Sequence, residues 1–229
     1  MHDHYLKMTT STFHRLKLFF QAYIVDHGFL RAIIPNRHKI STEHYPATYR
    51  SSHPSGNQVA SLAKRHNLKS ILSLRMPNAK GPYQLEKDAC NLFNVKLKHV
   101  EISSRKMPSV AAIMQIKEHL EQLPYPLLIH CKSGADRAGI TSVLYKHFIE
   151  KQPINEAIKQ LSLKYGHLKW AETGRLDFFF ESYLNYAQKH PQVSFTEWLN
   201  NEYDPETLEK SFKTNRFANI LVNKLLRRE

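Results

Sequence analysis

A ten-residue stretch from His130 to Gly139 holds the side chains best suited to chemistry. A loop that leaves a strand and enters a helix directs successive backbone N–H groups at one point, and the helix dipole adds positive potential there, so such a loop binds phosphate. That field would favour the nucleophilic thiolate of Cys131 at the start of the loop. Arg137 can hold two phosphoryl oxygens through its planar guanidinium, and Gly134 permits a close backbone approach. The stretch therefore predicts a phosphate-binding loop that carries a nucleophile.

The segments on either side of this stretch have the order that such a loop requires. The short apolar run 127–129 favours a central strand that is covered on both faces. Residues from Ala138 to about Ile149 are expected to form the helix that follows. The loop would then join the end of a buried strand to the beginning of a helix.

The rest of the chain alternates between strand and helix patterns. The strand patterns cover residues 47–51, 70–74 and 95–102, and the helical patterns cover residues 13–24, 55–66, 108–120, 154–165 and 175–187. One further helix is expected after Ser194, because Glu197 follows at the spacing of a capping box. This alternation predicts an α/β fold in one domain, with a central, mostly parallel sheet flanked by helices and with extra helices at both termini.

Composition limits the class of protein. The 229 residues carry a formal net charge of +13, so an anionic partner is expected. The two cysteines, Cys90 and Cys131, cannot form a multi-bridge framework and are not spaced with histidine as in a zinc site, so we expect no metal and no other cofactor. Charged residues interrupt the apolar segment 16–35, which argues against a signal peptide or membrane span. A cytoplasmic location is expected.

The order of His130, Cys131, Gly134 and Arg137 resembles the H-C-x-x-G-x-x-R signature of cysteine-dependent phosphatases, specifically the dual-specificity branch of the protein tyrosine phosphatase superfamily. Similarity to bacterial members extends over about residues 49–166. The resemblance implies a protein tyrosine phosphatase-like fold and hydrolysis of phosphomonoesters through a cysteinyl-phosphate intermediate. It makes Cys131 the nucleophile and Arg137 the phosphate clamp. It also implies these substrate-binding residues: His130, Lys132, Ser133, Gly134 and Ala135.

The acid that protonates the leaving oxygen departs from the family pattern. The usual aspartic acid precedes the cysteine by some thirty residues, where this chain offers Glu101 and no Asp. Asp136 offers a substitute, as in myotubularin-like and several bacterial lipid-directed members, and we expect it rather than Glu101 to be the acid. Ala138 replaces the Ser or Thr whose hydroxyl assists the sulfur as leaving group, so hydrolysis of the intermediate is expected to be slow.

The substrate class stays open between two kinds of phosphate. Lys132 also occurs in the phosphoinositide 3-phosphatase branch, and with the basic charge it favours inositol phosphates or phosphoinositides. Phosphotyrosine or phosphoserine proteins are the equal alternative. Two other functions compete: a catalytically weak pseudophosphatase that only binds phosphate, and an RNA 5′-phosphatase, although no nucleic acid partner is expected because RNA-binding motifs are missing from the sequence.

The domain boundaries follow from the resemblance and from the flanking patterns. Residues 1–45 are expected to form an N-terminal helix and lead-in packed on the domain, and residues 46–190 the dual-specificity phosphatase-like catalytic domain. Residues 191–229 would be a basic helical extension, which could touch an anionic membrane. His167 and Arg175 are expected near a second rim of the pocket, where surface or core roles are favoured.

Overall fold

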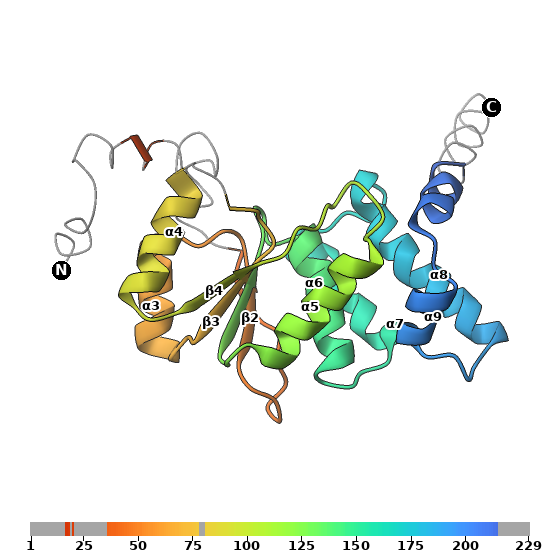
Figure 1. Ribbon diagram of the computed structural model, residues 1–229, viewed down its shortest axis with the longest axis horizontal. Coiled ribbons are helices and arrows are strands. Elements are labelled where there is room, and N and C mark those ends of the chain that lie inside the picture. The colour runs from red at the N-terminus through yellow and green to blue at the C-terminus, as the bar shows by residue number, and fades with distance from the viewer. Residues whose placement is uncertain (1–16, 19, 21–35, 78–80, 215–229) are drawn as a thin grey trace.

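The computed structural model describes residues 17, 18, 20, 36–77 and 81–214 (Figure 1). The expected helix over residues 13–24 lies almost wholly outside the described residues, as does the basic extension beyond residue 214. Residues 205–214, which belong to that extension, are helical. Among the described residues, no helix combines the length and the apolar character needed to span a bilayer.

A five-stranded sheet forms the centre of the molecule, in the order β1-β2-β5-β3-β4. β1 pairs antiparallel with β2, and the other neighbours are parallel. The strands are β1 (His38–Lys39), β2 (Thr48–Ser51), β3 (Ser70–Ser73), β4 (Lys96–His99) and β5 (Leu127–His130). All four residues of β5 are buried, as the apolar run predicts. The expected α/β class and mostly parallel sheet are confirmed.

Helices cover both faces of the sheet (Figure 1). On one face lie α3 (Gly56–His66) and α4 (Gly81–Leu92), and on the other lie α5 (Val110–Gln122) and α6 (Asp136–Phe148). Beyond α6 pack α7 (Ile154–Ala157), α8 (Arg175–Lys189) and α9 (Phe195–Asn201). Three 3₁₀ helices, η3 (Ile158–Gln160), η4 (Leu163–Tyr165) and η5 (Glu172–Gly174), connect α7 with α8. The parallel core is therefore buried between two helical layers.

The helix beginnings follow the capping signals of the sequence. Ser55 and Gln58 form a reciprocal capping box at α3, and Ser194 and Glu197 form the one predicted at α9. Ser109 caps α5, where its hydroxyl accepts the Ala112 N–H. These local bonds fix where each helix starts.

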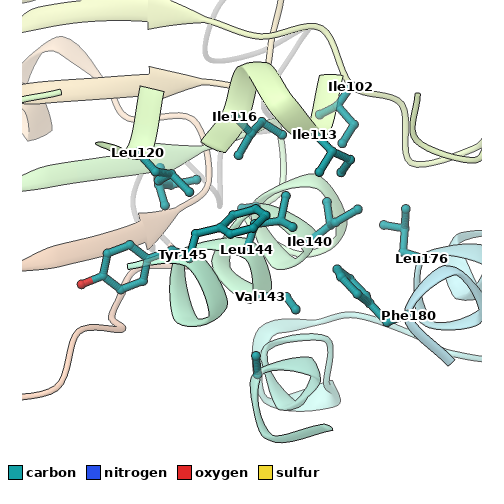
Figure 2. Close-up of a cluster of buried hydrophobic side chains, with 14 of the residues drawn as sticks. Ile102, Ile113, Ile116, Leu120, Ile140, Val143, Leu144, Tyr145, Leu176 and Phe180 are labelled. Carbon is teal, nitrogen blue, oxygen red and sulfur yellow. The ribbon is translucent and has the colours of Figure 1, made fainter. Parts of the chain in front are cut away.

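The larger of two buried apolar clusters lies between the sheet and α5, α6, α8 and α9. Figure 2 shows its centre, in which α6 contributes Ile140, Val143 and Leu144, and α8 contributes Leu176 and Phe180. Nearly every residue of α6 is buried. Because close-packed side chains resist displacement, this cluster holds α6 and α8 in a fixed relation.

Several elements differ from the sequence prediction. The expected helix over residues 154–165 is observed as α7, η3 and η4, because the backbone leaves the helical region at Leu161 with a φ of −95° and a ψ of 89°. The side chain of Leu161 packs over Gly139 of α6. The strand expected over 95–102 ends at His99, and α6 begins at Asp136 rather than at Ala138. β1 and α4 were not predicted, since the Gly81-Pro82 pair that begins α4 is typical of a turn as well as of a first helical turn.

Candidate active site

The parallel strands bring the chemistry to one edge of the sheet. His130 of β5 lies in register between Ser51 of β2 and Ser73 of β3. The carboxyl ends of these strands therefore meet, and the segments that leave them gather at that edge. The expected order of strand, Cys-bearing loop and helix is observed.

The loop 131–135 closes tightly around the cysteine. Cys131 is 1% exposed, and the Gly134 N–H donates to its Sγ at 3.2 Å. Gly134 has a φ of 78°, and a Cβ at this position would lie 2.6 Å from the Ser52 nitrogen. Only glycine fits here, which is the close approach that the sequence predicts.

Arg50 braces the loop from beneath. It is fully buried in β2, and its guanidinium donates to the carbonyls of Gly134 at 2.9 Å, Ala135 at 2.7 Å and Gln160 at 2.7 Å. Its Cζ lies 4.1 Å from the centre of the Tyr165 ring. Burial lowers the pKa of Arg50 to about 10, against the opposing effect of Tyr165. Sequence reasoning gave Arg50 no role, although an arginine inside a doubly covered strand is a signal for a buried bond network.

A buried group of polar side chains surrounds His130, the residue before Cys131. His130 Nε2 lies 2.7 Å from Glu86 Oε1, an ion-pair distance that lacks good hydrogen-bond alignment. His130 Nδ1 faces the Cys131 carbonyl at 3.4 Å, and the His53 ring packs edge-on at 4.9 Å between centroids. Burial would raise the pKa of Glu86, but the imidazoles of His130 and His53 outweigh burial and lower it to about 2. Glu86 comes from the unpredicted α4, and sequence reasoning missed it.

The same histidines and Glu86 are the group of donors that comes nearest to a metal site in the described residues. Their ligand atoms lie within 4.8 Å of one another. Because the Glu86 carboxylate already pairs with His130, we assign the group an electrostatic role under the loop.

Arg137 lies in the first turn of α6 and reaches toward the end of β3. Its Nη1 donates to the Leu74 carbonyl at 2.7 Å. It lines a cavity of about 300 Å³ together with Glu101 and Arg105. Cys131 is not among the described residues that line this cavity. Glu101 and Arg137 are thus brought to the same place, although they are far apart in the sequence.

Asp136 forms one end of a buried chain of three side chains. Its Oδ1 accepts from His167 Nδ1 at 2.7 Å, and Asp177 Oδ2 accepts from His167 Nε2 at 2.7 Å. Burial alone would lower the pKa of His167, but the bonds and charges of the two carboxylates raise it to about 9. His167 is therefore a buried residue that contacts Asp136. Asp177, the third residue of this hydrogen-bonded group, was not considered in the sequence analysis.

The remaining expected site residues are distributed around the loop. Lys132 is exposed, and the Ser133 hydroxyl accepts the Ala135 N–H at 3.4 Å. Ala138 is fully buried in α6. Arg175 is buried beside Glu172 and Glu209, which is a core role of the kind that the sequence favoured.

Cys90 belongs to the smaller apolar cluster beneath α3 and α4. Burial raises the pKa of its thiol well above the usual range. A thiol that stays protonated is unreactive, so the structure distinguishes the two cysteines by their surroundings.

Comparisons with known proteins agree with this architecture. Residues 45–153 match the model of the family described as "Tyrosine phosphatase family". No curated protein matches the sequence significantly. The core catalytic domain of the PP-IP phosphatase SIW14 from S. cerevisiae has 21% identity and a TM-score of 0.50, over 69% of this chain and 94% of that domain.

Two further solved structures are similar at lower scores. TpbA from P. aeruginosa has 18% identity over 59% of this chain and 79% of its own, with a TM-score of 0.44. PTPMT1, solved in complex with PI(5)P, has 16% identity over 66% of this chain and 98% of its own, with a TM-score of 0.45. Residues 45–153 of this chain are therefore similar to the tyrosine phosphatase family, and the chain has the fold of the SIW14 phosphatase domain.

Proposed function

We propose that this protein hydrolyses phosphomonoesters with Cys131 as the nucleophile. The observation that carries the proposal is the Gly134 N–H that donates to Cys131 Sγ at 3.2 Å, at the end of β5 and before the first turn of α6. A donor aimed at sulfur stabilises the thiolate, and the N-terminus of α6 adds positive potential at the same point. The loop can then hold the phosphoryl oxygens with its remaining N–H groups.

The reaction proceeds in two steps. The Cys131 thiolate forms an S–P bond while the ester P–O bond breaks, and Asp136 gives a proton to the departing oxygen. Water then attacks phosphorus, its proton returns to Asp136, and the S–P bond breaks to restore the thiolate and release phosphate. Arg137 stabilises the charge on the transferring group through two N–H contacts. Ala138, which is buried and has no hydroxyl, leaves the sulfur without the usual assistance in the second step.

We propose a substrate with more than one phosphate, of the inositol phosphate or phosphoinositide kind. Arg105 lines the same cavity as Arg137, and exposed Lys132 adds a cation beside the nucleophile. A cavity with two guanidinium groups suits a second phosphate next to the one that is cleaved. The similar solved structures include SIW14, which is described as a PP-IP phosphatase, and PTPMT1, which was solved in complex with PI(5)P. A cytoplasmic location fits the two unpaired cysteines.

The test is phosphate release from a panel of soluble inositol phosphates, phosphoinositides, phosphotyrosine peptides and 5′-phosphorylated RNA. Cys131→Ser serves as the blank, because a serine hydroxyl has no comparable anion at neutral pH. We expect release from the first two classes, and an Arg105→Gln variant should raise KM for them while p-nitrophenyl phosphate turnover changes little. Preference for phosphotyrosine or RNA would overturn the substrate class, and binding without turnover of any substrate would identify a pseudophosphatase.

A further inference from the structure

Three side chains from separate parts of the fold form one continuous hydrogen-bonded chain. Asp136 comes from the first turn of α6, His167 from the segment after η4, and Asp177 from the first turn of α8. Both bonds measure 2.7 Å. The side chains of His167 and Asp177 are 1% and 6% exposed, whereas that of Asp136 is 23% exposed. The chain therefore has a buried end at α8 and an accessible end at the phosphate-binding loop.

The hydrogen-bond geometry of Asp136, His167 and Asp177 places a hydrogen on both ring nitrogens of His167. Each ring nitrogen of His167 lies against a carboxylate oxygen, and each of those bonds requires a hydrogen on nitrogen. The ring is therefore an imidazolium between two carboxylates, which agrees with its pKa of about 9. Two cations interact electrostatically with these three side chains. Arg50 of β2 interacts with Asp136, and Lys169 interacts with Asp177.

Asp136 needs a nearby source of a proton if it is to act as the general acid. Asp136 Oδ1 accepts the N–H of His167 Nδ1 at 2.7 Å, and an oxygen that accepts a hydrogen bond has no proton of its own to give to a leaving group. His167 lies at hydrogen-bond distance with a proton on Nδ1. A bound phosphate dianion near Asp136 would shift that proton toward the carboxylate, because the protonated acid is then the less repulsive form.

We propose that His167 and Asp177 are positioning residues that store the proton which Asp136 delivers to the leaving oxygen. The inference rests on the proposed phosphatase function. In the first step His167 Nδ1 gives its proton to Asp136, whose carboxyl turns about its Cβ–Cγ bond and passes the proton to the ester oxygen as that oxygen leaves phosphorus with the bonding electron pair. In the second step the attacking water loses a proton to Asp136, and that proton returns to Nδ1. One proton thus cycles without any co-reactant.

Asp177 keeps the ring in the correct form throughout this cycle. While the cysteinyl phosphate exists, His167 is neutral and has a single N–H. Asp177 Oδ2 accepts that N–H at Nε2, so Nδ1 stays unprotonated and faces Asp136, ready to take the proton back. Leu176 and Phe180, the apolar neighbours of Asp177 on α8, pack against α6 in the core (Figure 2), which holds the carboxylate at its place.

The test compares kcat/KM against pH for two substrates with the full chain, because kcat/KM reports the first step even where the second step limits kcat. Phenyl phosphate needs its leaving group protonated, whereas p-nitrophenyl phosphate needs little protonation. In the wild type, kcat/KM for phenyl phosphate should fall above about pH 9, where His167 loses its proton. Asp177→Asn removes one of the two charges that hold the proton, so the falling limb of kcat/KM for phenyl phosphate should move down by about one pH unit or more, and that for p-nitrophenyl phosphate should move less.

His167→Gln removes the proton source itself, and kcat/KM for phenyl phosphate should drop by about 10²-fold with only a few-fold loss for p-nitrophenyl phosphate. Asp88→Asn, an exposed Asp on α4, is the matched control for loss of one carboxylate. Equal losses for both substrates in Asp177→Asn, without movement of the limb, would overturn the inference and leave the phosphatase function intact. Absence of Cys131-dependent p-nitrophenyl phosphate turnover in the wild type would instead overturn the proposed function.

Discussion

At the scale of the residue, the proposed chemistry depends on the planar shape of the Arg137 guanidinium as well as on its charge. The Arg137 guanidinium already donates Nη1 to the Leu74 carbonyl at 2.7 Å, and this bond aims the rest of the fork toward the loop. A lysine at the same place offers one ammonium, which cannot bond Leu74 and hold two phosphoryl oxygens at once. The role of Arg137 thus combines position with charge.

We therefore expect Arg137→Lys to lower kcat for p-nitrophenyl phosphate by about 10²-fold or more, since the lost contacts act on the transferring group. The fold should survive, because position 137 faces the cavity and not the core. Steady-state kinetics and circular dichroism measure the two effects. Activity within a few-fold of the wild type would remove Arg137 from the site.

The choice between two candidate acids is also a question about single residues. Asp136 has a proton donor at 2.7 Å in His167, whereas Glu101 lines the cavity beside Arg137. We expect Asp136→Asn to slow phenyl phosphate about 10²- to 10⁴-fold and p-nitrophenyl phosphate far less. Glu101→Gln should affect both substrates equally and only slightly. If the leaving-group dependence appears in Glu101→Gln instead, the acid is Glu101.

At the scale of the element, the loop conformation is set by β2 as much as by the loop itself. Arg50 of β2 ties three carbonyl groups together, two of them in the loop. Removal of the guanidinium would leave these buried carbonyls without their donors, which costs far more than the bonds contribute when they are made. The sheet register that places β2 beside β5 is what makes this contact possible.

Replacement of Arg50 by Met should therefore lower the free energy of unfolding by about 3–5 kcal/mol, as expected for a broken buried charge network. Urea titration measures this loss. Arg50→Lys should lose less stability but also reduce kcat, because one ammonium cannot hold both loop carbonyls and Gln160. As a surface control, Lys87 on α4 is exposed, and Lys87→Met should change stability by less than about 0.5 kcal/mol. A stable, fully active Arg50→Met protein would contradict the brace.

Local signals in the sequence predicted the elements whose beginnings they fix. The buried run before Cys131 predicted β5, and the Ser194–Glu197 spacing predicted α9. The helix expected over residues 154–165 was wrong because its break is set by distant contacts, with Leu161 over Gly139 and Tyr165 beneath Arg50. Tertiary packing of this kind overrides local propensity and cannot be seen in a short window.

The partners of the site residues could not be predicted for the same reason. The motif located Cys131 and Arg137, yet Glu86 lies 44 positions before His130 and comes from a helix with a turn-like beginning. Asp177 is linked to Asp136 through His167 only because α8 packs against α6. The sequence shows which residues can do chemistry, and the packing of helices on the sheet decides which residues support them.

At the scale of the whole molecule, two groups of buried charged side chains make the folding free energy depend on pH, one at acidic and one at alkaline pH. The Glu86 group lies under the loop on the side of α4, and the His167 group lies between α6 and α8. The first contains a carboxyl with a lowered pKa, and the second an imidazole with a raised one. Folding free energy depends on pH wherever a group binds its proton differently in the folded and unfolded states.

The signs give a defined window. His167 has a folded pKa of about 9 against an ordinary 6.5, so its stabilisation is complete below about pH 6.5 and is lost as pH rises through about 9. Glu86 has a folded pKa of about 2 against an ordinary 4.5, so its stabilisation is complete above about pH 4.5 and is lost as pH falls toward 2. We therefore expect maximal thermal stability between about pH 4.5 and 6.5.

Thermal unfolding between pH 3 and pH 10 measures this window. The Tm of the wild type should decline below about pH 4.5 and above about pH 6.5. Each variant should weaken one of these two declines and leave the other unchanged. His167→Gln should flatten the decline between pH 7 and pH 10, because the group that releases the proton is gone, whereas Glu86→Gln should reduce the decline below pH 4.5 and leave the alkaline side unchanged. Asp88→Asn, on the surface, should follow the wild type on both sides. An alkaline decline that is equally steep in the wild type and in His167→Gln would show that the proton between Asp136 and Asp177 contributes nothing to the stability of the fold.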